Sequence, residues 1–231
     1  DPPLASDPLF LPDYDGTLAE ITTDPAQAHP HPQVAALLKE LARKGPVYLL
    51  TGRGVRDLAR LVPVPDIRVI GVHGLETGVL TGDGEARDVG SGLDEAQARL
   101  LDAVRESLPE VPGVRVEDKG SALALHYREA SDPVRVEEAL LEWSGSLPAG
   151  VQVIWGKMVA EVRPLGFDKG RAALATARRH PGATPVMIGD DTTDEDAFRA
   201  LTEGVTIKVG AGPSAARYRL SSVDEVVGYL Q

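Results

Sequence analysis

The feature of this sequence that most limits its fold is a pair of aspartates directly after a short apolar run. Leu9–Leu11 is apolar enough for a buried strand, and Asp13 and Asp15 follow it, with Gly16 ending the extended pattern. Side chains two residues apart in an extended chain point the same way, so both carboxylates can reach one site. That site lies at the carboxyl end of a strand, where open α/β sheets bind ligands. Metal binding, nucleophilic attack and proton transfer all remain open as its chemistry.

Helices and strands alternate along the first third of the chain, which predicts a parallel sheet. The apolar positions predict helices at 33–44 and 54–62 and strands at 47–50 and 67–72. Thr51 and Arg53 follow one of these strands, and His73 and Gly74 follow the next. Proline-containing residues 1–8 are expected to form a loose arm, and residues 22–32 a loop.

The pattern changes in the middle of the chain. There the sequence predicts a helix at 93–108, strands at 114–118 and 122–128, a helix opened by Asp132-Pro133, and strands at 151–155 and 158–163. The Gly156-Lys157 pair suits a type II′ turn between the last two strands. We therefore predict an antiparallel α+β unit at 92–162, inserted into an α/β core made of 1–91 and 163–231.

Further charged residues follow the inserted unit. Asp168 can cap a helix that carries Lys169 in its first turn. A lysine there is unfavourable for the helix dipole, so a compensating anion is expected nearby. A buried strand at 185–188 then ends in the acidic run that contains Asp190, Asp191 and Asp194. A helix at 195–201, a strand at 205–209 and a terminal helix opened by Ser222 complete the expected order.

Overall charge and composition exclude several classes of partner. The net charge is −11, which argues against nucleic acid as the main partner. No stretch of about 18 apolar residues is present, so we expect no membrane-spanning helix and no membrane partner. There is no cysteine and no visible signal peptide, which fits a cytoplasmic protein. We also expect a monomer.

Taken together, the polar strand ends resemble the four motifs of the haloacid dehalogenase-like phosphatase superfamily. These are Asp-x-Asp-Gly-Thr (13–17), Thr51, Lys169 and Gly-Asp-Asp-x-x-Asp (189–194). Motifs over nearly the whole chain look like those of trehalose-6-phosphate phosphatases: 50–53, 71–76, 116–120, 125–128, 156–164, 168–170 and 189–198. The resemblance implies a Rossmann-like parallel-sheet core with an inserted αββαββ cap that selects the substrate.

The resemblance also implies a role for each motif in hydrolysing a sugar phosphate. Asp13 would attack phosphorus and form an aspartyl-phosphate, and Asp15 would serve as general acid and then base. Thr51 and Lys169 would bind the phosphate. Mg²⁺ would be held by the carboxylates of Asp13 and Asp190 and the backbone carbonyl of Asp15, with Asp191 and Asp194 holding these ligands in place.

On the cap, the resemblance assigns sugar-hydroxyl binding to Glu117 and Lys119 and to Lys157 and Glu161. Arg53, His73 and Gly74 are further candidates for substrate binding. Arg53 could instead tie down a loop, and His73 could be structural. Pro12 departs from the expected pattern because it removes a donor near the end of a central strand.

Three functions stay open at this stage. The first is hydrolysis of trehalose 6-phosphate with Mg²⁺. The second is hydrolysis of a related ester, such as a sucrose or mannosylglycerate phosphate. The third is a catalytically silent sugar-phosphate sensor, which need not keep both carboxylates of the first motif.

Overall fold

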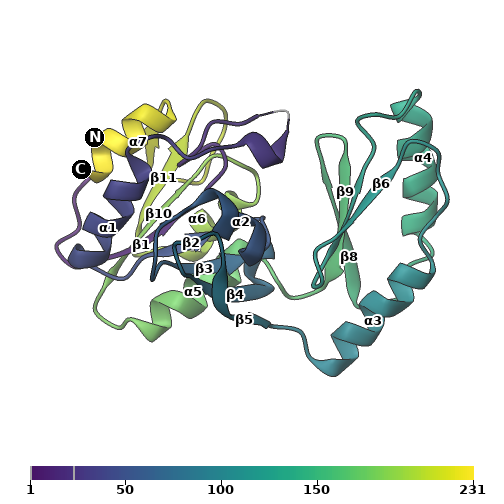
Figure 1. Ribbon diagram of the computed structural model, residues 1–231, viewed down its shortest axis with the longest axis horizontal. Coiled ribbons are helices and arrows are strands. Elements are labelled where there is room, and N and C mark those ends of the chain that lie inside the picture. Colours follow the sequence, from purple (N-terminus) through teal and green to yellow (C-terminus); the bar gives the residue numbers. More distant parts are fainter. Residues whose placement is uncertain (1, 23) are drawn as a thin grey trace. The chain divides into compact units, whose positions relative to one another are not determined.

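A computed structural model describes residues 2–22 and 24–231, so the expected arm 1–8 and loop 22–32 each include one residue outside these ranges. The chain forms two compact units (Figure 1). The core unit comprises Asp1–Gly90 and Phe167–Gln231, and the cap unit comprises Ser91–Gly166. The core unit resumes at Phe167, four residues later than residue 163, where the sequence prediction placed it.

The core unit is built on a mostly parallel sheet. One half has the strand order β1-β10-β11-β12 and the other β2-β3-β4-β5. The halves meet where Phe10 pairs with Val47 in parallel and its N–H donates to the Pro46 carbonyl at 2.9 Å. The strands are β1 Pro8–Pro12, β2 Tyr48–Leu50, β3 Arg68–Gly71, β4 Glu76–Leu80, β5 Ala86–Ser91, β10 Thr184–Gly189, β11 Val205–Val209 and β12 Tyr218–Leu220. The pairs β2–β3, β1–β10, β10–β11 and β11–β12 are parallel, whereas β4 is antiparallel to β3.

Helices cover both faces of this sheet. They are α1 Val34–Lys44, α2 Val55–Leu61, α5 Lys169–Arg179, α6 Asp194–Ala200 and α7 Val223–Leu230, with short 3₁₀ turns η1 Pro25–Gln27 and η2 Val72–Gly74. Phe10 of β1 packs in a cluster with residues of α1, α2 and α7. Its neighbours Leu9 and Leu11 pack in a second cluster with residues of α5 and α6. A strand buried on both faces is typical of parallel α/β sheets, and the predicted fold class is confirmed.

Pro12 does not disturb the end of β1. It is aligned with Ile188 of β10, and the next residue continues the pairing, because the Asp13 N–H donates to the Ile188 carbonyl at 2.8 Å. The departure from the expected sequence pattern therefore leaves the strand that carries Asp13 in regular geometry.

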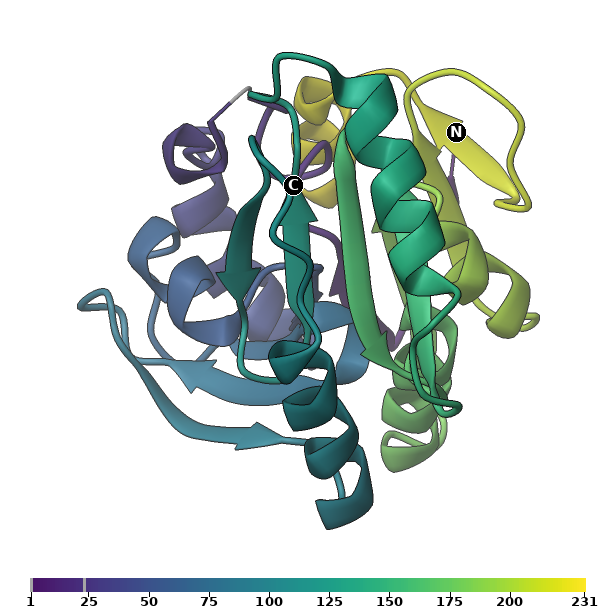
Figure 2. The same ribbon diagram turned by 90° about the vertical axis from the view of Figure 1, so that its right-hand side faces the viewer.

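The cap unit is an antiparallel sheet with two helices on one side (Figure 2). Its strands, in the order β6-β7-β9-β8, are β6 Arg115–Asp118, β7 Leu123–His126, β8 Val151–Gly156 and β9 Val159–Pro164. The helices are α3 Glu95–Glu106 and α4 Pro133–Ser144. Apolar residues of β7 and β9, including Leu125 and Val162, pack with Val104 of α3 and Leu140 of α4. The cap unit thus has its own hydrophobic core.

The turn between β8 and β9 differs from the sequence prediction. Gly156 is the last residue of β8 and pairs with Val159, so Lys157 and Met158 form the turn. The left-handed residue is Met158, with φ 63°, and not the glycine. Within the described residues, no helix is long and apolar enough to cross a membrane.

Candidate active site

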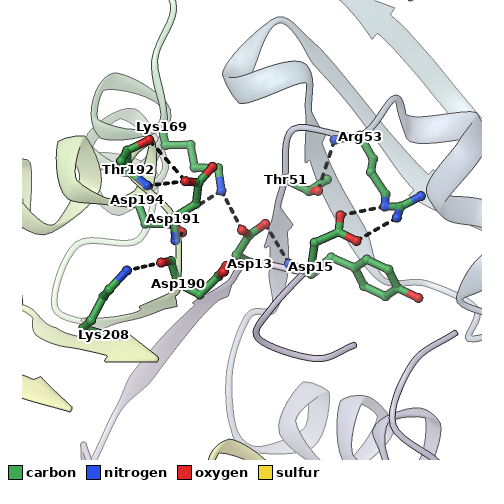
Figure 3. A network of polar contacts seen from close by, with 11 residues as sticks. Asp13, Asp15, Thr51, Arg53, Lys169, Asp190, Asp191, Thr192, Asp194 and Lys208 are labelled. Carbon is green, nitrogen blue, oxygen red and sulfur yellow. Dashed lines mark hydrogen bonds and ion pairs between the residues drawn. The ribbon is translucent and has the colours of Figure 1, made fainter. Parts of the chain in front are cut away.

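Charged side chains from separate parts of the chain meet at the carboxyl ends of the central core strands (Figure 3). Asp13 and Asp15 follow β1, Thr51 and Arg53 follow β2, and Asp190 follows β10. Lys169 is the first residue of α5 and Asp194 the first of α6. All of these residues belong to the core unit.

Lys169 is the buried centre of the group. Its Nζ lies 2.9 Å from Asp13 Oδ2 and donates to Asp194 Oδ1 at 2.7 Å. Burial alone would lower the pKa of the Lys169 ammonium, but the two carboxylates outweigh it and raise that pKa. The compensating anions expected beside a lysine at a helix N-terminus are these two aspartates.

The carboxyl group of Asp13 is also buried and has a raised pKa. Removal from water is the main cause, opposed by Lys169 and reinforced by Asp194 and Asp190. Its Oδ1 accepts the Tyr14 N–H at 2.7 Å, which fixes the orientation of the carboxylate at the end of β1. Asp13 is therefore held at one position beside a buried cation.

Asp190 completes an acidic group with Asp13 and Asp194. Each of the three offers a carboxylate oxygen, and these oxygens lie within 4.8 Å of one another. Burial, with the added repulsion of Asp194 and Asp191, raises the pKa of Asp190 to about 7. Three carboxylates share one lysine here, so a hard divalent cation fits the charge and the donor set of this group.

Two glycines make this close packing possible. A Cβ atom at Gly16, whose φ is +68°, would lie 2.2 Å from Cγ of Asp190. A Cβ atom at Gly189 would lie 2.2 Å from Cγ of Asp194. Any side chain at either position would displace a carboxylate of the acidic group.

Asp15 lies apart from the acidic group and is bound by Arg53. Arg53 Nε donates to Asp15 Oδ2 and Nη2 donates to Oδ1, both at 2.7 Å. The guanidinium also lies over the ring of Tyr14, 5.4 Å from its centroid. Arg53 was a candidate for substrate binding in the sequence analysis, and the structure pairs it with Asp15.

Thr51 is fully buried beside this pair. Its hydroxyl oxygen accepts the Arg53 N–H at 3.2 Å, so the hydroxyl proton can still be donated to another group. His73 and Gly74 lie in η2, after β3. A Cβ atom at Gly52 would lie 2.8 Å from the His73 ring, and one at Gly74 would lie 3.0 Å from Cβ of Ala172. His73 therefore packs closely against the loop after β2, and Gly74 against helix α5.

Two further residues, Lys208 and Asp191, change the pKa of Asp190 in the acidic group. Lys208 of β11, which the sequence analysis missed, donates from Nζ to the backbone carbonyl of Asp190 and lowers the pKa of its carboxyl group. Its only sequence signal is a single cation in a short strand that is mostly apolar. Asp191 is exposed, and its Oδ1 accepts the Thr192 N–H at 2.6 Å. Asp191 thus acts on Asp190 through charge, while Asp194 is a full member of the group.

The sheet face of the cap unit opposite its helices carries the remaining candidates. Glu117, Ala124 and Glu161 lie in one row across β6, β7 and β9. Glu117 Oε2 lies 2.8 Å from His126 Nε2, and Lys119 Nζ donates to Glu161 Oε2 at 2.8 Å. The hydrogen bond to His126 is the main reason that the pKa of Glu117 is lowered. Lys157 lies in the exposed turn between β8 and β9.

The sequence matches the family model described as trehalose-phosphatase over residues 11–224. It is 33% identical over 244 residues to the trehalose-6-phosphate phosphatase of Escherichia coli, covering 100% of this chain and 88% of that protein. It is 37% identical over 231 residues to the trehalose-phosphate phosphatase of Mycobacterium avium, covering 93% of this chain and 59% of the relative. The chain spans about three fifths of the length of the first mycobacterial relatives that it matches, 60% for that of Mycobacterium marinum.

The chain is also similar to solved structures of proteins with this name. The C-terminal domain of the trehalose-6-phosphate phosphatase of C. albicans aligns with a TM-score of 0.74 at 25% identity, covering 98% of this chain and 91% of that one. Fold and site together define an α/β protein whose mostly parallel core sheet carries a buried carboxylate and lysine site and whose core is interrupted by an α+β unit. Within that class, the chain belongs to the trehalose-phosphatase family. The family predicted from the motifs is confirmed.

Proposed function

We propose that this chain is a phosphatase that hydrolyses trehalose 6-phosphate to trehalose and phosphate. The observation that carries the proposal is the setting of Asp13 in a trehalose-phosphatase chain. Its buried carboxylate lies between a lysine and two other aspartates, at the end of the central strand. A carboxylate that is oriented, shielded from water and next to a cation is suited to attack an anionic ester.

Mg²⁺ is the metal that we propose for the acidic group. Asp13 and Asp190 would supply carboxylate oxygens and Asp15 its backbone carbonyl, and Asp194 would keep Lys169 and the Asp191 N–H in place. Hard oxygen donors with room for water are what Mg²⁺ prefers. When bound, the ion supplies positive charge that offsets repulsion between the nucleophile and the phosphate.

In the first step, an oxygen of Asp13 forms a bond to phosphorus while the bond from phosphorus to the sugar oxygen breaks. Asp15 gives a proton to that leaving oxygen, so trehalose leaves as the neutral alcohol. Thr51 and Lys169 bind the transferred phosphoryl group, the lysine offsetting its negative charge.

In the second step, water attacks the aspartyl-phosphate. Asp15, now a carboxylate, takes a proton from this water, and the bond between phosphorus and the Asp13 oxygen breaks. Inorganic phosphate leaves, and both carboxyl groups return to their starting protonation states. We also propose that the active unit is a monomer.

We propose that the polar face of the cap selects the sugar. Glu117, Lys119, Lys157 and Glu161 offer both acceptors and donors, which is what a polyol requires. Glu117 and Glu161 share a row on that face, which supports a joint role. His73 and Gly74 remain proposed substrate-binding residues of the core.

The test is release of inorganic phosphate from a panel of sugar phosphates with Mg²⁺ present. The panel includes trehalose 6-phosphate, sucrose 6-phosphate, mannosylglycerate phosphate, glucose 6-phosphate and 4-nitrophenyl phosphate. We expect the highest kcat/KM for trehalose 6-phosphate. A clear preference for another sugar ester would replace the proposed substrate, and binding without turnover of any ester would indicate a sensor.

A further inference from the structure

We infer that Arg53 is a positioning residue that fixes the carboxylate of Asp15, and that the segment Gly71–Glu76 fixes Arg53 in turn. The inference deepens the proposed function and rests on it, because Asp15 is there the general acid and base. It assigns Arg53 a role other than direct binding of substrate. It also assigns a role to Glu76 of the motif 71–76.

The ion pair between Arg53 and Asp15 determines the plane of the carboxylate. Two parallel N–H donors, both at 2.7 Å, engage both oxygens at once. A bidentate guanidinium fixes orientation as well as distance, which a lysine cannot do. The side chain of Asp15 is 39% exposed, so without Arg53 it could turn into water. The side chain of Arg53 is only 13% exposed and is the anchored partner.

Tyr14 also helps to hold the guanidinium of Arg53 in place. The Arg53 guanidinium lies 5.4 Å from the centroid of its ring, and Tyr14 is itself fully buried. The Tyr14 hydroxyl donates to the Ala28 carbonyl at 2.6 Å, so the ring is fixed at both ends. The Nε–Nη2 edge of Arg53 is taken by Asp15, and one face of the guanidinium is taken by Tyr14.

The backbone of Arg53 is held by the segment Gly71–Glu76. The Val72 N–H donates to the Arg53 carbonyl and the His73 N–H to the Thr51 carbonyl, each at 3.0 Å. Val72 and His73 reach these positions with φ of 45° and 55°, a conformation that is costly for residues other than glycine. The strained turn thus places its two amides on the two carbonyls that border Gly52.

Glu76 completes this support. Its Oε2 accepts the N–H of Val55, the first residue of α2, at 3.0 Å, which fixes the chain just after Arg53. Gly71 allows the close approach, because a Cβ atom there would lie 2.7 Å from the Arg53 carbonyl oxygen. The segment between β3 and β4 therefore holds Arg53, and Arg53 in turn orients Asp15, the proposed acid and base after β1. A misplaced catalytic group loses rate even when every reacting side chain is present.

The experiment compares Arg53→Ala, Arg53→Lys and the exposed control Arg56→Ala, with Mg²⁺ present and trehalose 6-phosphate as substrate, because its sugar oxygen must be protonated as it leaves. The readouts are kcat, KM and the inhibition constant of inorganic phosphate. We expect Arg53→Ala to lower kcat by roughly 10²-fold, the scale of general acid–base catalysis. KM and the inhibition constant should stay within about threefold, and millimolar guanidinium should restore part of kcat, as in cavity rescue of a deleted group. Arg56→Ala should match the wild type.

A double-variant test separates positioning from phosphate binding. Added to Asp15→Asn, Arg53→Ala should cost less than about threefold more, because residues acting as one unit are non-additive. Loss of phosphate affinity with kcat retained, unchanged kcat in Arg53→Ala, or a full additional loss in the Asp15→Asn background would each overturn the inference. If Arg53→Ala has no thermal transition, Arg53→Lys carries the same readouts. A wild type that is inactive on every ester would instead refute the proposed function.

A smaller effect is expected for Glu76, which acts on Asp15 only through Arg53. Glu76→Gln keeps the size of the side chain but replaces the carboxylate that accepts the Val55 N–H. It should lower kcat by less than Arg53→Ala does, again with KM nearly unchanged. A larger loss than that of Arg53→Ala would show that the segment acts by another route.

Discussion

The polar groups of the core and those of the cap are organised differently. In the core site, Lys169 binds two buried carboxylates at once, and three carboxylates share the space around it. On the cap face, Glu117 and His126 form a pair whose side chains are 36% and 28% exposed, whereas Glu161 is buried and lies near both Lys119 and Arg163. Charges fixed by several buried partners suit bond making, whereas exposed pairs can exchange partners with a sugar hydroxyl at low cost.

The largest expected effect is on Asp13, the proposed nucleophile. Asp13→Asn keeps the size of the side chain and removes its negative charge, so turnover of every ester should fall by at least roughly 10⁴-fold. Single-turnover phosphate release measures this loss, and Asp224→Asn on the exposed surface is the matched control. Substantial activity in Asp13→Asn would contradict the covalent mechanism and the idea that the core alone carries the chemistry.

Removing the buried cation should be the next largest effect. Lys169→Met leaves Asp13 and Asp194 buried without their partner, which costs about 3–5 kcal/mol of stability for a buried pair of this kind. Urea unfolding without metal measures the change. The double variant Lys169→Met with Asp194→Asn should recover part of it. Equal stability of the wild type and Lys169→Met would show that this group is less tightly coupled than the geometry indicates.

A cap substitution should affect selection instead of chemistry. Glu117→Ala should lower kcat/KM for trehalose 6-phosphate by roughly 10- to 100-fold, the cost of losing a hydrogen bond to a charged group. For 4-nitrophenyl phosphate the change should stay within about threefold. Glu142→Ala, on the exposed side of α4, serves as control. Equal losses with both esters would remove the distinction between the two units.

The smallest effect is a difference in pH dependence. The pKa of Asp190 is raised to about 7 in the fold, so the folded protein without metal keeps a proton that the unfolded chain releases above about pH 4. The stability from this group is therefore lost as the pH rises toward 7. The pKa of Glu117 is lowered, so its contribution is instead lost as the pH falls.

Thermal unfolding at pH 5 and pH 8 tests this difference. Mg²⁺ should raise Tm more at pH 8, because at pH 5 a proton on Asp190 competes with the metal. Asp190→Asn should remove most of that gain, while Glu117→Gln should leave it intact. A gain from Mg²⁺ that is the same at both pH values would contradict the raised pKa of Asp190.

Much of the fold could be predicted from the sequence, because apolar runs and helix stripes mark its regular elements. The hairpin β4–β5 was missed because Glu76–Leu80 contains a glycine and two polar residues and lacks a clear alternation. Strand β12 has only three residues, Tyr218–Leu220, too few for a pattern. The turn at Met158 was misplaced because Gly156, two residues earlier, offered the easier left-handed position.

For the candidate site, the sequence indicated which residues follow each strand but not which of them pair. The order of the strands in the sheet brings Asp13 and Asp190 together. Their separation along the sequence does not reveal that they are close in space. Whether Arg53 contacts a ligand or Asp15 depends on side-chain conformation and on the turn at Val72 and His73. Lys208 lies inside a mostly apolar strand, so only the parallel pairing of β10 with β11 reveals its position beside Asp190.

The hydrophobic core of the cap has a consequence for how such proteins diverge. Ser91–Gly166 follows Gly90, ends in Gly166 and has a hydrophobic core of its own. A segment of that kind can be exchanged as a unit, so proteins that share one core unit could acquire a new sugar preference through a single insertion.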